Sequence, residues 1–256
     1  MGTHKTTSPH LASSALPDRL VKNRNSLKAV RAAAMPFFPT RTIVGAMFEF
    51  QGVWQALEPV MAQPPHHRPP VHPVLYLKPA NTWCRAGDAV RLPPEVEEVE
   101  VGATLGISFA RTASRVSEAQ ALDCVAGYGI VNDVTVPHQA LLRPPMKQKC
   151  RDGFCPIGPW VPAGQIPNPD ALGIRAYVNG ELRQRSHTGQ LRRNVARLIA
   201  DVSEFMSLAP GDLLLIGVAE QPARARPGDT MAIEIDGIGR LENPVQRESA
   251  APQEAA

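Results

Sequence analysis

The sequence predicts a mixed β fold with a few helices, built as one large domain. The chain has 256 residues, of which 43% are hydrophobic, and this suffices for one domain with a substantial core. Its 26 prolines are too many for a protein of long helices, because proline breaks helices. Short apolar runs separated by turns rich in glycine and proline are typical of strands.

The first half of the chain is expected to contain three strands and one short helix. The apolar segments 42–48 and 74–78 predict strands, and 53–62 a helix. Between them, residues 63–73 hold five prolines and three histidines. The prolines keep the histidines off a shared helix face, so we expect a loop without a metal site. Residues 102–109 are nearly all apolar, as in a strand buried on both faces.

The second half is expected to contain two helices and two strands that follow turns. Ser117 and Gln120 form a capping box, which predicts a helix to about Val125 that stops at Gly127. A longer helix is expected after Thr188 and should end at Pro210-Gly211. Its predicted apolar stripe comprises Leu191, Val195, Leu198, Ile199, Val202, Phe205 and Met206. Two Pro-Gly-Asp turns should start strands over 213–218 and 231–235.

Composition places one domain at 41–248, between two ends that differ from it. Residues 1–38 lack an apolar period and carry an excess of five positive charges, and 249–256 form a short tail. We expect both ends to be disordered. Residues 1–34 are alternatively an organelle leader, or precede a true start at Met35.

We predict that residues 1–38 are dispensable for folding, because they offer no apolar surface to a core. A chain that starts at Met35 should unfold at the same temperature as the full chain, as measured by calorimetry. A substantially lower midpoint would contradict this expectation.

Charge and cysteine usage exclude several function classes. The net charge is +3, so residues 41–256 carry about −2 once the basic leader is removed, and no nucleic-acid partner is expected. No apolar run is long enough to cross a bilayer, so no membrane is expected either. Four cysteines without metal or disulfide spacing fit reduced thiols in a cytoplasmic protein.

Six segments in order resemble the fumarylacetoacetate hydrolase family. They are Tyr76-Leu-Lys-Pro79, Gly127-Tyr-Gly-Ile-Val-Asn-Asp133, Lys149-Cys-Arg-Asp-Gly-Phe-Cys-Pro-Ile-Gly-Pro-Trp160, Val178-Asn-Gly180, the Pro-Gly-Asp pair and Gly237-Ile-Gly-Arg-Leu-Glu-Asn243. The resemblance implies the family's mixed β-roll. It is strongest to the amino-terminal half of two-domain members that act as decarboxylase and isomerase in 4-hydroxyphenylacetate catabolism.

The resemblance also implies a small 2-oxo diacid substrate, chelated by Mg²⁺ or Mn²⁺, whose charge stabilises a developing enolate. Family members bind the ion with Glu-x-Glu on one strand and a later Asp. The Asp is present as Asp133, but Gly102 and Thr104 stand at the glutamate positions, so the site is expected to be incomplete or without metal. A register shift that brings in Glu98 and Glu100 would restore it.

Lys149 matches the family's active-site lysine and is our candidate for catalysis and substrate binding. Thr188 matches a substrate-binding threonine, and is alternatively the cap of the following helix. The family's lid histidine segment reads Glu49–Val53 here, and its late threonine segment reads Ile216–Ala219. Both functional side chains are therefore missing.

Two hypotheses follow. The chain is a subunit of a decarboxylase and isomerase, or it is a non-catalytic pseudo-domain that stabilises a metal-bearing homologous subunit. A homodimer is the alternative assembly. Glu-x-Glu on the metal strand discriminates between them, and its absence favours the pseudo-domain.

Overall fold

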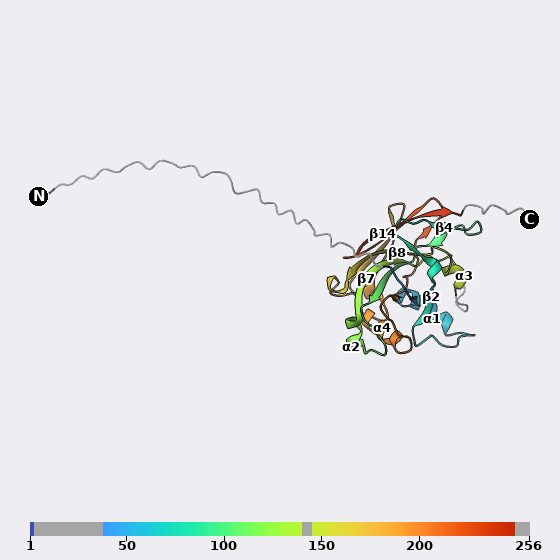
Figure 1. Cartoon of the computed structure of the whole chain (residues 1–256), viewed down its shortest axis with the longest axis horizontal. Helices are drawn as coiled ribbons and strands as arrows, with labels where there is room; N and C mark the ends of the chain where they lie inside the picture. Colours follow the sequence, from blue (N-terminus) through green and yellow to red (C-terminus); the bar gives the residue numbers. More distant parts are fainter. Residues whose placement is uncertain (3–37, 140–144, 249–256) are drawn as a thin grey trace, which may run out of the picture. The chain divides into compact units, whose positions relative to one another are not determined.

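A computed structural model describes residues 1–2, 38–139 and 145–248 (Figure 1). From residue 38 on they belong to one compact unit, Ala33–Ala256. The expected N-terminal extension, apart from its first two residues and residue 38, and the tail 249–256 lie outside the described residues. No helix in the described part is long and apolar enough to cross a membrane.

Strand residues clearly outnumber helical residues in the described structure, so the predicted mixed β class is confirmed. They are β1 (Ile43–Met47), β2 (Val74–Lys78), β3 (Trp83–Arg85), β4 (Val90–Leu92), β5 (Val99–Glu100), β6 (Ala103–Phe109), β7 (Val125–Asn132), β8 (Cys155–Pro162), β9 (Gly173–Val178), β10 (Glu181–His187), β11 (Leu213–Leu215), β12 (Arg224–Ala225), β13 (Thr230–Ile235) and β14 (Gly239–Arg247). The α-helices are α1 (Gln51–Met61), α2 (Glu118–Ala121), α3 (Met146–Lys149) and α4 (Val195–Ser203).

Two mixed sheets carry the core. The larger has the order β2-β1-β11-β6-β7-β8-β3, with parallel pairs β1–β11 and β3–β8, and the smaller has the order β10-β9-β13-β14-β4. The smaller sheet packs on the larger one where β14 meets β7 and β8, and Leu241 fills the space above Gly158. Every residue of β6 is buried, as its nearly all-apolar sequence predicts. Each such Leu or Ile contributes about 1.5–3 kcal/mol.

Three predicted elements need correction. The helix that begins after Ser117 continues from Ala121 as a 3-10 turn, Leu122–Cys124, so its expected end near Val125 is confirmed. The expected stop at Gly127 is wrong, because β7 begins at Val125 and Gly127 lies in that strand. The strand from Leu213 ends at Leu215, because Gly217 has a φ of 96° and turns the chain.

The longest predicted helix is also shorter than expected. It starts at Val195 with Asn194 as its cap, and it ends at Ser203 rather than at Pro210. Its inner face is buried as predicted, but Phe205 lies beyond its end and is 62% exposed. In Figure 1, α4 lies beside α2, against which it packs.

Candidate functional site

Asp133 lies at the centre of the candidate site, one residue beyond the end of β7. Its amide donates to the Gly102 carbonyl at 2.8 Å, which continues the pairing of β7 with β6. The residue is only 1% exposed. A carboxylate at this depth needs partners, because burying an unpaired charge is costly.

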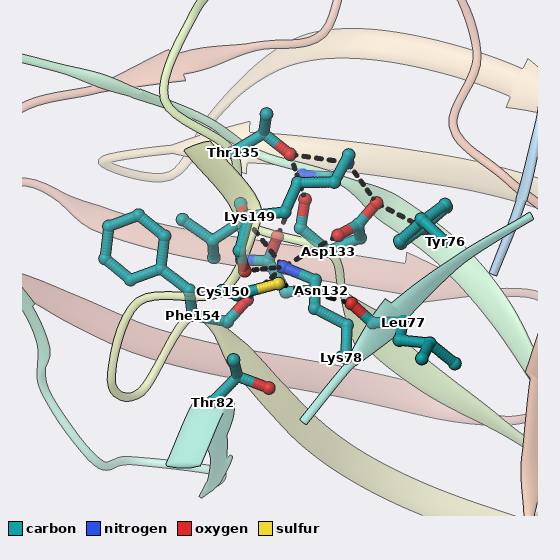
Figure 2. A network of polar contacts seen from close by, with 12 residues as sticks. Tyr76, Leu77, Lys78, Thr82, Asn132, Asp133, Thr135, Lys149, Cys150 and Phe154 are labelled. Atoms are coloured by element: carbon teal, nitrogen blue, oxygen red, sulfur yellow. Dashed lines mark hydrogen bonds and ion pairs between the residues drawn. The ribbon is translucent and has the colours of Figure 1, made fainter. Parts of the chain in front are cut away.

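Three side chains supply these partners (Figure 2). Lys78 Nζ lies 2.8 Å from Asp133 Oδ1, and Lys149 Nζ lies 2.6 Å from Oδ2. The Tyr76 hydroxyl donates to Oδ2 at 2.5 Å. Oδ2 thus accepts two hydrogen bonds, whereas Oδ1 is ion-paired with Lys78 and accepts no hydrogen bond in the described chain.

Lys78 joins three segments of the chain at one buried ammonium group. Besides Asp133, its Nζ reaches the carbonyl oxygens of Val134, Lys149 and Phe154 at 2.8–2.9 Å. Its side chain is fully buried. An ammonium group has three hydrogens, and the three carbonyl oxygens use them all, so its contact with Asp133 is an ion pair without a hydrogen bond.

Lys149 ends α3 and stands closer to the surface. Its Nζ donates to the Thr135 hydroxyl at 2.7 Å and lies 4.6 Å from the centre of the Tyr76 ring. Its side chain keeps 10% exposure, whereas that of Lys78 keeps none. Of the two lysines, Lys149 is therefore the one that a small molecule could reach.

The two ammonium groups determine the ionisation of Asp133. Burial by itself raises the pKa of its carboxyl, but the charges of Lys149 and Lys78 outweigh this and lower the pKa to about 2. Burial, and to a lesser extent the Asp133 charge, raise the pKa of Tyr76 well above its usual value. Tyr76 thus stays a neutral donor to an ionised carboxylate.

We expect Tyr76→Phe to destabilise the chain by about 1.5–3 kcal/mol, the usual contribution of a hydrogen bond to a charged group. Chemical denaturation measures this. Tyr177→Phe is the matched control, because the half-buried Tyr177 hydroxyl donates to Glu234 at 2.9 Å, and its loss should cost less. Equal effects would show that the Asp133 contact has no special weight.

The described residues do not fit the divalent metal that the resemblance implies. Gly102 lies opposite Asp133, and a Cβ at this position would overlap the Asp133 backbone carbonyl. A glutamate therefore does not fit here unless the backbone shifts. Thr104 is fully buried in β6, and its hydroxyl finds no hydrogen-bond partner in the described chain. Two lysine ammonium groups also face the Asp133 oxygens, and the described residues contain no group of three His, Cys, Asp or Glu side chains that could hold the ion.

The alternative register does not occur in the structure. Unbroken pairing of β6 with β7 from Ala103 to Ser108 fixes the alignment. Glu98 faces Arg224 and Arg226, at 2.6 and 3.2 Å. Glu100 belongs to the separate strand β5, but its charge still acts on Lys149. It is the second acid of this region, and burial raises its pKa.

Thr188 makes contacts of a different kind. It is buried, and its hydroxyl accepts from the Leu172 amide at 2.9 Å. It opens a 3-10 turn, Thr188–Gln190, while the α4 cap is Asn194, so the proposed cap role for that helix is wrong. Its hydroxyl is used in tying the turn to Leu172.

The segment that stands in place of the family's lid histidine, Glu49–Val53, is held by an ion pair with Arg193. Glu49 is 1% exposed and accepts two hydrogen bonds from Arg193, at 3.0 and 3.2 Å. Arg193 also donates to Asp201 at 2.9 Å and to the Val71 carbonyl at 2.5 Å. The late segment, Ile216–Ala219, is apolar, and all of it is buried except Val218, which is half-buried. Neither segment carries the family's functional side chain.

Comparison with known proteins gives consistent matches. A family model described as "Fumarylacetoacetate (FAA) hydrolase C-terminal" matches residues 42–246. The 4-hydroxyphenylacetate degradation bifunctional isomerase/decarboxylase of Salmonella dublin is 37% identical over 207 residues, which cover 81% of this chain and 47% of that protein. The chain thus spans about half the length of this relative.

Solved structures agree with this match. The 5-carboxymethyl-2-hydroxymuconate delta-isomerase from Mycobacterium smegmatis is 31% identical, with a TM-score of 0.68 over 82% of this chain and 80% of that one. The fumarylpyruvate hydrolase from Pseudomonas aeruginosa, in complex with Mn²⁺ and pyruvate, is 27% identical, with a TM-score of 0.72 over 85% and 94%. The fold expected from the resemblance is confirmed.

Proposed function

The chain belongs to the fumarylacetoacetate hydrolase family, and on this premise we propose that it is a subunit of 5-carboxymethyl-2-oxo-hex-3-ene-1,7-dioate decarboxylase / 2-hydroxyhepta-2,4-diene-1,7-dioate isomerase in 4-hydroxyphenylacetate catabolism. Within it, this chain is the non-catalytic partner that stabilises a homologous, metal-bearing subunit. The free cysteines suit a cytoplasmic location, which stays part of the proposal.

The proposal rests on the contacts that Asp133 makes within this chain. Its oxygens bind two lysines and a tyrosine, and Gly102 leaves no room for a further ligand. The Mg²⁺ or Mn²⁺ of the reaction therefore belongs to the partner. There it would supply Lewis-acid chemistry at the 2-oxo group of the diacid.

Lys149 is the residue of this chain that we assign to the substrate. Its side chain keeps 10% exposure, and its ammonium group suits a carboxylate or enolate oxygen. Thr188 is not part of this assignment, because its hydroxyl is used by Leu172.

The test is to express this chain with a homologue that carries all three metal-binding carboxylates. We expect the two to co-elute in gel filtration, and the complex, but not this chain alone, to decarboxylate the diacid with Mg²⁺ or Mn²⁺. Metal-dependent turnover by this chain alone would refute its non-catalytic role. A homologue that is fully active alone and forms no complex would refute the subunit, and a symmetric pair of this chain would point to the homodimer.

A further inference from the structure

A groove of about 640 Å³ lies away from Asp133, between the end of β1, the end of α1 and the proline-rich loop. Its walls are formed by Phe48, Met61, His66, Arg68, Pro69, Pro70, Val71, His72, Pro73 and Val74. The volume falls within the range of roughly 300–1,000 Å³ that is usual for small-molecule sites. None of the residues discussed above as substrate or metal candidates lines it.

The chemistry of the walls defines what the groove can hold. Phe48, Met61, the prolines and the two valines are apolar, whereas Arg68, His66 and His72 offer nitrogen donors. No lining residue carries a carboxylate. An apolar body with one negative end complements such walls, because the body displaces water and the arginine pairs with the charge.

The groove is held in shape before any ligand arrives. Arg193 is fixed by its ion pairs with the buried Glu49 and with Asp201, and it binds the Val71 carbonyl at 2.5 Å. At the start of the loop, the amides of His66 and His67 both donate to the Gln63 carbonyl at 3.0 Å. A loop fastened at both ends loses little entropy when it binds a ligand.

From these observations we infer that the groove binds a small organic carboxylate with an apolar body, for which hexanoate serves as the probe. The inference does not depend on the proposed function. Val74 lies two residues before Tyr76 on β2, so the groove adjoins the Asp133 cluster along one face of the strand without sharing a residue with it.

The test is calorimetric titration of the full chain with hexanoate, with 1-hexanol, which has the same body without the charge, and with acetate, which has the charge without the body. We expect hexanoate to bind with a Kd on the order of 1 mM or tighter, and the other two at least tenfold more weakly. Arg68→Gln should weaken hexanoate at least tenfold, whereas Arg91→Gln, at an exposed position on β4, should not.

A second variant tests the place rather than the charge. Val71 is 74% exposed on the groove wall, so Val71→Trp should fill the groove without disturbing the core. Equal affinity for hexanoate and 1-hexanol, or binding unchanged in both the Arg68 and the Val71 variants, would overturn the assignment. So would a dimer that Val71→Trp dissociates, because the groove would then be a protein contact.

Discussion

Asp133→Asn should destabilise this chain by about 3–5 kcal/mol, the cost of leaving buried charges without their counter-ion. The change keeps the shape of the side chain but removes the charge that faces Lys78 and Lys149. Lys78 has no exposed surface, so water cannot replace the lost carboxylate. Urea unfolding followed by circular dichroism measures the loss.

Asp236→Asn is the matched control. Asp236 binds Arg175 at 2.7 Å, but its side chain is 49% exposed, so its loss should cost less than about 1 kcal/mol. Adding Lys149→Met to Asp133→Asn should recover part of the loss, because one unpaired ammonium group is then removed. Similar losses in the two single variants would contradict a buried charge centre.

The same carboxylate predicts a dependence on pH. Its pKa is depressed to about 2 in the folded chain, below the ordinary value of 3.8, so its contribution is fully present above about pH 4 and is lost as the pH falls towards 2. The contribution is about 2 kcal/mol. Asp133→Asn should remove this part of the acid dependence, and an unchanged acid profile in the variant would rule it out.

Much of the fold was predictable where a local sequence pattern is typical of one kind of secondary structure. The nearly all-apolar run of β6 is short and is typical of a strand buried on both faces. The α4 start was not predictable in this way. Leu191 continues the helical spacing, but it forms a β-bridge with Phe50, a residue far away in the sequence. Spacing alone cannot separate a helical residue from one that a distant strand holds.

The same distinction between local patterns and distant contacts applies to the candidate site. Asp133 and Lys149 were identified because each stands in a motif that resembles the family's. Tyr76 and Lys78 stood in such a motif too, but nothing local showed that they reach Asp133. The Tyr76 contact joins residues 57 positions apart and forms only when β2 and β7 enter the same sheet. The sequence also gave no sign of the role of Gly45, whose lack of a side chain makes room for the Tyr76 ring.

We expect Mg²⁺ and Mn²⁺ to leave the stability of this chain unchanged. An ion present at 100 times its Kd would add about 2.7 kcal/mol to the free energy of unfolding. Here it would have to displace two ammonium groups and a hydroxyl from Asp133, and it would gain no carboxylate from Gly102 or Thr104. Thermal unfolding with each ion and with EDTA measures the difference.

The fumarylpyruvate hydrolase from Pseudomonas aeruginosa, whose structure contains Mn²⁺, is the positive control and should be stabilised under the same conditions. Gly102→Glu should not restore binding, because the added Cβ meets the Asp133 carbonyl, and the variant should instead lose stability. Micromolar binding by the unaltered chain that disappears in Asp133→Ala would refute the closed site. If Glu100→Gln also abolished it, the second ligand would come from β5, which would have to approach Asp133 once Lys149 had moved aside.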